Sequence, residues 1–175
     1  MHDTTSWPLT LYRFGTTALT PFIGGLLAWR MQKGKEDRTR ASERRGYAGR
    51  ERPPGRLAWM HGASVGETVS LLPIVQRLTR QGFTVLVTSG TATSAQLLAE
   101  RLPARSLHQF VPLDVTSYVR RFLDHWRPDI VLIAESEIWP NALIEIRERG
   151  IPALLLNARM SKRSFNRWRR LPHTA

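Results

Sequence analysis

The stretch Leu57-Ala-Trp-Met60, followed by His61-Gly-Ala-Ser-Val-Gly-Glu67, decides how the rest of the chain is interpreted. Its first four residues form an apolar run, which is typical of a strand buried on both faces of a parallel sheet. Small residues follow, and a helical pattern of apolar residues begins near Val69. A strand, a glycine-bearing turn and a helix in this order place the turn at the C-terminal edge of an open α/β sheet, where the start of the helix offers free N–H groups to a ligand.

Glu67 has two interpretations at this point. Ser64 to Glu67 has the S-x-x-E spacing of a capping box, with Ser64 as the N-cap and Glu67 at the third helical position. A carboxylate at the mouth of such a turn is also placed to take a proton from a bound hydroxyl group. The spacing by itself favours the structural interpretation and leaves the chemical one open.

The chain after residue 56 alternates strand-like and helical patterns. Apolar or β-branched runs predict four further strands, at 83–88, 107–111, 130–134 and 153–156. Asp114 is expected to cap the helix that ends at Trp126, Thr93 to Gln96 reads as a second capping box, and Pro140 suits the first position of another helix. This order predicts an α/β fold, a Rossmann-like doubly wound parallel sheet, with strands in the order 3-2-1-4-5.

The turns that follow the strands of such a sheet all open on one edge. We therefore expect the turns at 64–67, 89–93, 135–141 and 157–161 to form one site. Strand alternation would put Glu135 and Glu137 on the same side of the chain. A second carboxylate near Glu67 would raise one pKa by like-charge repulsion and so suit a general base. The alternative for Glu135 or Glu137 is an ion pair with an arginine at the sheet edge.

The first 32 residues predict a membrane-associated helix. Phe14 to Trp29 contains no charged residue, but a spanning helix needs about 20 apolar residues, and a proline and two glycines interrupt this one. A tilted span, an interfacial helix and a helix packed on the domain all fit, whereas positive charge after the apolar run disfavours a signal peptide. The basic residues downstream favour an anchor over 1–32 on the cytoplasmic side, followed by a solvated basic linker over 33–56 and the domain over 57–175.

The positive charge of the chain lies outside the predicted sheet. Residues 30–56 hold ten basic and four acidic residues, residues 151–175 hold six basic residues and no acidic one, and residues 57–150 hold nine of each. Such flanks suit nucleic acid, anionic lipid or a phosphorylated substrate. The chain has no cysteine, which excludes disulfides, cysteine-ligated zinc and thiol catalysis.

Four blocks, in order along the chain, resemble the signature of the 3-deoxy-D-manno-octulosonic acid (Kdo) transferases: His61–Glu67, Thr91-Ala-Thr93, Glu135-Ser-Glu-Ile-Trp-Pro-Asn141, and Asn157-Ala-Arg-Met-Ser161 with Arg163-Ser164. The resemblance implies the N-terminal half of a GT-B glycosyltransferase, anchored on the cytoplasmic face of the bacterial inner membrane. It implies transfer of Kdo from CMP-Kdo to lipid A precursor in lipopolysaccharide biosynthesis, with inversion and without a metal or other cofactor. It also implies a C-terminal donor-binding domain that we expect to be missing here.

The resemblance assigns roles residue by residue. It makes Glu67 the proton acceptor and Glu135 the residue that stabilises the transition state, with Glu137 as second choice. It implies substrate contacts from Ser64, Gly66, Thr91, Thr93, Asn141, Arg159 and Ser161. Arg159 is the preferred contact for the phosphates of the acceptor, since arginine binds phosphate through paired, charge-assisted hydrogen bonds. The family usually has glycine where this chain has Ser94, which puts the geometry of that turn in question.

Several alternatives stay open. A non-catalytic membrane-associated binding module would keep the acceptor surface without turnover. A nucleic-acid-binding protein would fit the sequence pI of about 11.5, but no nucleic-acid-binding motif is present and we expect no such partner. A divalent metal at the acidic edge ranks lower, because no D-x-D or histidine cluster occurs. His61 is either a substrate contact or a packed histidine, and Trp139 is either core or a binding platform.

Overall fold

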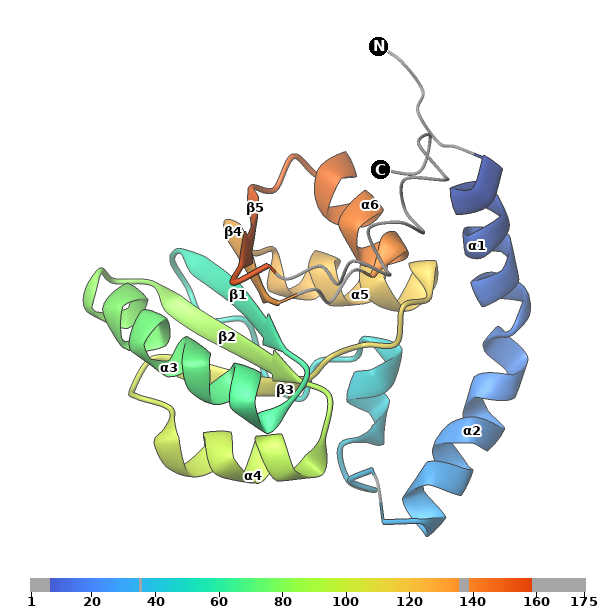
Figure 1. Ribbon diagram of the computed structural model, residues 1–175, viewed down its shortest axis with the longest axis horizontal. Helices are drawn as coiled ribbons and strands as arrows, with labels where there is room; N and C mark the ends of the chain where they lie inside the picture. Colours follow the sequence, from blue (N-terminus) through green and yellow to red (C-terminus); the bar gives the residue numbers. More distant parts are fainter. Residues whose placement is uncertain (1–6, 35, 136–138, 159–175) are drawn as a thin grey trace.

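The computed structural model describes residues 7–34, 36–135 and 139–158. Five parallel strands form one sheet, in the order β3-β2-β1-β4-β5. Figure 1 shows helices on both sides of this sheet, with α1 and α2 forming an arm along one side of the molecule. The strands are β1 Leu57–Gly62, β2 Thr84–Ser89, β3 Ser106–Phe110, β4 Ile130–Ala134 and β5 Ala153–Leu156. The helices are α1 Trp7–Ala18, α2 Thr20–Gln32, the 3-10 helix η1 Ala41–Arg45, α3 Val65–Arg80, α4 Ala92–Arg101, α5 Thr116–Trp126 and α6 Pro140–Glu148.

The predicted strand order is confirmed, with β1 at the centre. Trp59 pairs with Leu86 on β2 and with Val131 on β4. Every residue of β1 and β2 is buried. Helices cover both faces of the sheet, so neither face is exposed to solvent and the strands do not alternate apolar with polar residues. From β1 the chain adds β2 and β3 on one side and then returns to add β4 and β5 on the other side. The C-terminal ends of β1 and β4 therefore flank the switch point, which is where open α/β sheets bind ligands.

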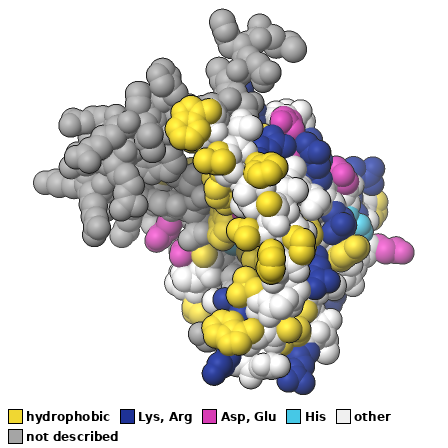
Figure 2. Space-filling view, turned by 90° about the vertical axis from the view of Figure 1, so that its right-hand side faces the viewer, with side chains coloured by type: hydrophobic (Ala, Val, Ile, Leu, Met, Phe, Trp, Pro, Cys, Tyr) yellow, Lys and Arg dark blue, Asp and Glu magenta, His cyan; other side chains and the backbone are white. Residues whose placement is uncertain are grey.

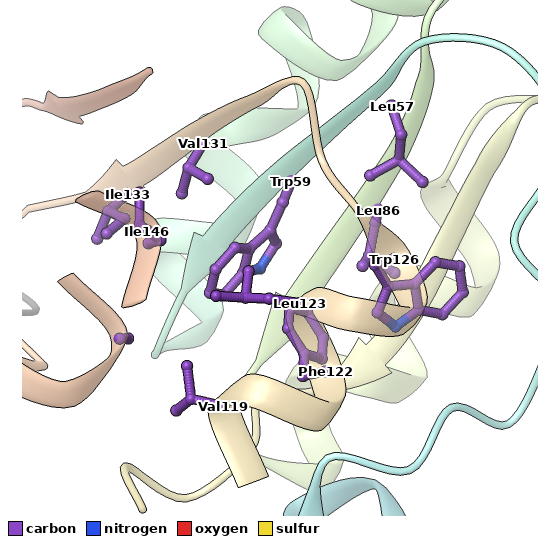
Figure 3. Close-up of a cluster of buried hydrophobic side chains, with 11 residues drawn as sticks. Leu57, Trp59, Leu86, Val119, Phe122, Leu123, Trp126, Val131, Ile133 and Ile146 are labelled. Atoms are coloured by element: carbon purple, nitrogen blue, oxygen red, sulfur yellow. The ribbon is translucent and has the colours of Figure 1, made fainter. Parts of the chain in front are cut away.

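Alternate residues of β1 supply two hydrophobic cores. Leu57 and Trp59 face α5 and α6, where the Trp59 and Phe122 rings lie 4.7 Å apart between centroids (Figure 3). Ala58 and Met60 face the opposite side and pack in the core that includes Leu71 of α3 and Leu98 of α4. On α5, Val119, Phe122 and Leu123 are buried in the first of these cores.

The apolar N-terminal segment folds as two helices that lie against the domain. The break falls at Leu19, and not at the proline or glycines that interrupt the sequence pattern. Ile23 and Leu27 are buried against Val115 and Tyr118. No helix within the described ranges is both long enough and apolar enough to cross a bilayer.

The other side of α1 and α2 exposes large apolar side chains. They are Trp7, Leu11, Phe14, Leu19, Phe22, Leu26 and Trp29. Figure 2 shows apolar side chains gathered along this face of the molecule, with lysine and arginine side chains beside them. An exposed apolar area of this kind is typical of an interaction surface.

The connector between α2 and β1 is not the solvated linker that its composition predicts. Glu36, Glu43 and Arg44 are each less than 10% exposed. Arg44 Nε lies 2.9 Å from a Glu36 oxygen, and Glu43 accepts a 2.7 Å hydrogen bond from the backbone N–H of Phe110 on β3. Burial of these charges is tolerated because each one has a charged partner and further hydrogen bonds.

Two predicted helix caps are wrong. Asp114 does not cap α5, whose N-cap is Val115; its carboxylate instead accepts hydrogen bonds of 3.0 and 2.9 Å from the backbone N–H groups of Asn141 and Ala142, in the first turn of α6. The N-cap of α4 is Thr91, not Thr93, because Thr91 has the extended backbone of a cap and its hydroxyl accepts from the N–H of Ser94. A local sequence pattern could not predict the bonds from Asp114 to α6, because Asn141 and Ala142 lie 27 and 28 residues further along the chain.

Candidate active site at the C-terminal edge of the sheet

The ends of the four relevant strands lie at the same edge of the sheet, as predicted. Gly62 pairs with Ser89 at the ends of β1 and β2, and Ala134 pairs with Leu156 at the ends of β4 and β5. The turns after β1 and β2 touch, since a Cβ added at Gly90 would lie 3.1 Å from the carbonyl oxygen of Ala63. Three predicted site residues lie outside the described part of the chain: Glu137, Arg159 and Ser161.

The Glu67 carboxylate is held at the start of α3. One oxygen accepts a 2.8 Å hydrogen bond from the backbone N–H of Ala63, and the other accepts a 2.7 Å bond from the Ser64 hydroxyl. Ser64 Oγ in turn accepts from the N–H of Glu67 at 3.3 Å. The capping interpretation is therefore confirmed. A carboxylate has about four lone-pair positions, so the two bonds leave capacity to accept a further hydroxyl proton.

Two glycines shape the space around this cap. A Cβ at Gly62 would lie 3.0 Å from the N of Thr68 and 3.2 Å from the Cβ of Glu67, so glycine allows α3 to begin this close to the end of β1. Gly66, by contrast, is exposed and has no heavy atom within 4 Å of a Cβ placed on it. Ser64 is exposed as well. The backbone beside the carboxylate is thus open to a ligand on this side.

Glu135 follows β4 in a left-handed backbone conformation, with φ +56. Asn157, which follows the neighbouring strand β5, has φ +52, and the N–H of Glu135 donates to the carbonyl of Leu156 at 2.7 Å. Such a conformation is costly for a glutamate, whereas asparagine adopts it more readily, and backbone strain of this kind concentrates at functional sites. Within the described residues the Glu135 carboxylate has no ion-pair partner, so the alternative of an arginine pair is not seen for it. No signal in the sequence predicts this backbone.

The remaining predicted contacts differ in exposure. Thr91 and Thr93 are exposed at the start of α4, although the Thr91 hydroxyl is already engaged with Ser94. Asn141 is fully buried, and its amide donates to the Asp114 carbonyl at 2.6 Å and to the Thr16 hydroxyl. In this conformation Asn141 holds α6 in place and offers no side-chain atom to a substrate.

His61 is a packed histidine rather than an exposed one. Its side chain lies at the end of β1 and is 2% exposed. Its Nδ1 lies 3.0 Å from the Thr88 hydroxyl and 3.2 Å from the Thr88 carbonyl oxygen. Burial lowers the pKa of His61 to about 4, although the Thr88 carbonyl and the nearby Glu67 both act to raise it. The imidazole is therefore neutral at pH 7.

Comparison with known proteins decides the family. A family model described as 3-deoxy-D-manno-octulosonic-acid transferase (Kdo transferase) matches residues 39–175. The chain belongs to this family. The match takes in the buried connector as well as the sheet, in agreement with the packing of residues 39–56 against the domain.

Curated Kdo transferases match this chain over most of its length. A probable mitochondrial 3-deoxy-D-manno-octulosonic acid transferase of Arabidopsis thaliana is 39% identical over 160 residues, which is 90% of this chain and 36% of that protein. The 3-deoxy-D-manno-octulosonic acid transferase of Rickettsia bellii is 38% identical over 165 residues, which is 93% of this chain and 39% of the relative. That of Haemophilus influenzae is 30% identical over 165 residues, again 39% of the relative. The chain thus spans about two fifths of the length of these Kdo transferases.

The buried, neutral His61 predicts an acid-dependent loss of stability. Its folded pKa of about 4 lies below the value of about 6.5 in an unfolded chain. The unfolded state therefore binds a proton first, and the stabilisation that is complete above pH 6.5 is lost as the pH falls towards 4. We expect the His61→Gln variant to lose less stability than wild type between pH 7 and pH 4.5, by on the order of 2 kcal/mol, in urea unfolding followed by circular dichroism. Parallel pH profiles for the two proteins would contradict a buried, neutral His61.

Proposed function

We propose that this chain is the acceptor-binding half of a Kdo transferase, which binds lipid A precursor and supplies the catalytic base for transfer of Kdo from CMP-Kdo. The observation that carries the proposal is the Glu67 carboxylate, fixed at the open edge of the sheet by Ser64 and Ala63. Membership of the Kdo transferase family supports the substrate class. Because the relatives are much longer than the aligned stretch, we propose that the donor is bound by a segment outside it.

The proposed chemistry needs one proton acceptor. As the acceptor hydroxyl oxygen bonds to the anomeric carbon of Kdo, the bond from that carbon to the phosphate oxygen of CMP breaks and CMP leaves with the electron pair. The hydroxyl proton passes to Glu67. The two hydrogen bonds of the cap keep the carboxylate in one position, which removes the entropy cost of orienting it for the reaction. Glu135 is the proposed second acidic residue, at the end of β4 on the same edge.

The cap provides a test that separates structure from catalysis. Glutamine serves in a capping box as glutamate does, but it cannot take up a proton. We expect Glu67→Gln to lower the transfer rate roughly a hundredfold or more while the melting temperature stays within a few degrees. The assay is Kdo transfer from CMP-Kdo to lipid A precursor, by a chimera that joins this chain to the remaining part of the Rickettsia bellii relative.

Glu100→Gln, on the exposed side of α4, is the matched control and should transfer Kdo at the wild-type rate. A chimera that is active and keeps more than a tenth of its rate after Glu67→Gln would remove Glu67 from the mechanism. That result would favour the alternative function, a binding module in which Glu67 serves only as a cap.

We also propose that the chain lies on the cytoplasmic face of the inner membrane, with α1 and α2 in the plane of the interface. The two helices expose Phe14 and Phe22, which are 72% and 71% exposed. Exposed basic residues follow them at Lys33, Arg38 and Arg45. Apolar side chains beside lysine and arginine suit an anionic bilayer surface. The inner sides of the helices are engaged with the domain, as in the 3.1 Å pair between Arg13 and Glu145, which favours a surface-bound arm.

Membrane association is testable by sedimentation with vesicles of phosphatidylcholine and phosphatidylglycerol. The double variant Phe14→Ser, Phe22→Ser should bind at least tenfold more weakly, since burying one phenylalanine contributes roughly 1.5–3 kcal/mol. Tyr47→Ser, which removes an exposed aromatic side chain from the connector, should bind as wild type does. Equal binding by all three proteins would contradict the proposed surface, and so would a stable dimer that loses its association in the double variant.

A further inference from the structure

Arg44 is a buried arginine of η1 that the proposed transfer chemistry does not use. The residue is 3% exposed, and its Nε lies 2.9 Å from an oxygen of Glu36, which is buried as well. A buried ion pair is weak evidence for stability, because the cost of removing two charges from water can exceed their mutual attraction. We therefore looked for a role for Arg44 in the groups that its guanidinium contacts.

The guanidinium of Arg44 joins the ends of two neighbouring strands. Nη2 donates to the Gly90 carbonyl at 2.6 Å, and Nη1 donates to the Val111 carbonyl at 3.1 Å. The paired residues of β2 and β3 end at Ser89 and Phe110, so both carbonyls lie one residue beyond them. Because the planar guanidinium carries its N–H groups in fixed directions, it holds the two carbonyls at a set spacing where the strands no longer do so.

Gly90 in turn lies against the loop that holds Glu67. A Cβ added at Gly90 would lie 3.1 Å from the carbonyl oxygen of Ala63 and 3.8 Å from its Cα. This carbonyl lies in the chain between the two groups that anchor the Glu67 carboxylate, which are the N–H of Ala63 and the hydroxyl of Ser64. A displacement of Gly90 would therefore be passed to both anchors.

On its other side, the Arg44 side chain is tied to the N-terminal arm. One oxygen of Glu36 accepts from Nε of Arg44, and the other accepts a 2.8 Å bond from Nε of Arg30, in the last turn of α2. Each group in this series is hydrogen-bonded to the next, or in close contact with it. The turn after β2 therefore has a fixed position relative to the arm, the connector and the Glu67 loop.

We propose that Arg44 is a positioning residue for the transfer reaction, and that it holds the Glu67 carboxylate in place through Gly90 and Ala63. The inference rests on the proposed function, because it needs Glu67 to accept the proton. Arg44 does not touch the substrate in this role; it limits the movement of the loop that carries the two anchors. A small displacement of the carboxylate leaves the fold and the substrate-binding residues intact, but it removes the alignment on which proton transfer depends.

Two variants test the role of Arg44 in the chimera. Gly90→Ala places a methyl group against the Ala63 carbonyl and forces a small shift there. Arg44→Lys keeps the charge beside Glu36 but replaces the planar guanidinium by a point charge. Each variant should lower kcat roughly tenfold, and should leave KM for the acceptor within about twofold of wild type because the lost alignment matters only in the transition state.

Arg52→Lys is the matched control. Arg52 also bridges backbone carbonyls, those of Trp126 and Gly55, but these residues precede β4 and β1 and lie away from the C-terminal edge. The same substitution at this position should leave kcat at the wild-type value.

A second measurement does not need turnover. Hydrogen exchange of the full chain, followed by NMR, reports on the bond from the Ala63 N–H to Glu67. Weakening this bond in Gly90→Ala or Arg44→Lys should make the Ala63 amide exchange roughly fivefold faster, while the amides of Trp59 and Met60 in β1 keep their wild-type protection. Faster exchange along the whole of β1 would show a general loss of stability and would contradict a positioning role.

The Glu67→Gln background separates this inference from the proposed function. Gly90→Ala and Arg44→Lys should have almost no further effect on kcat there, because the positioned group is already inactive. An unchanged kcat, a rise in KM alone, or equal losses with and without Glu67 would overturn the positioning role. A chimera that keeps its rate after Glu67→Gln would overturn the proposed function itself, and the positioning role with it. Should Arg44→Lys fail to fold, Gly90→Ala carries the test alone.

Discussion

The hydrogen bonds that Glu67 accepts from Ser64 and from the backbone of Ala63 fix two things at once. They end the run of β1 and begin α3, which sets the position of the central strand–helix unit. They also hold a carboxylate at the edge of the sheet in one orientation. The capping and catalytic interpretations of this residue therefore do not compete, because a carboxylate that is anchored through one lone pair on each oxygen keeps the others for a substrate.

The rest of the fold keeps this edge in place through buried charge. Glu145 of α6 is 1% exposed and contacts Arg13 of α1, Arg120 of α5 and Arg149. Burial alone would raise the pKa of Glu145, but the hydrogen bonds from Arg120 and Arg149 outweigh it and leave the pKa below its ordinary value. This network ties the N-terminal arm to the two helices that cover one face of the sheet. The exposed apolar face of the arm consequently has a fixed position relative to the strand ends.

A second tie between the arm and the sheet runs through Asp114. Its carboxylate accepts from the Tyr12 hydroxyl at 2.9 Å as well as from the first turn of α6. Burial raises the pKa of Asp114, while the hydrogen bonds from Asn141, Ala142 and Tyr12 oppose the rise. The start of α6 is thus held by the loop between β3 and α5 and by α1.

The sequence predicted the features that depend on short-range pattern. The strand order followed from five apolar runs, and the Ser64 cap followed from four consecutive residues. The features that it missed depend on contacts between distant segments. Asp114 was assigned to the nearer helix, and Arg44 and Glu36 were placed in solvent because a basic, glycine-rich composition does not reveal a buried ion pair. The left-handed backbone of Glu135 carries no signal, since neither glutamate nor its neighbours favour it.

The proposed transfer reaction requires Ser64 to hold the Glu67 carboxylate in position for proton transfer. A double-mutant cycle on the Kdo transfer rate of the chimera measures this coupling directly. Ser64→Ala should lower the rate roughly tenfold when Glu67 is present, and should have almost no effect in the Glu67→Gln background, because the positioned group is then already inactive. The same fold loss in both backgrounds would show that the two residues act independently, and would contradict the account.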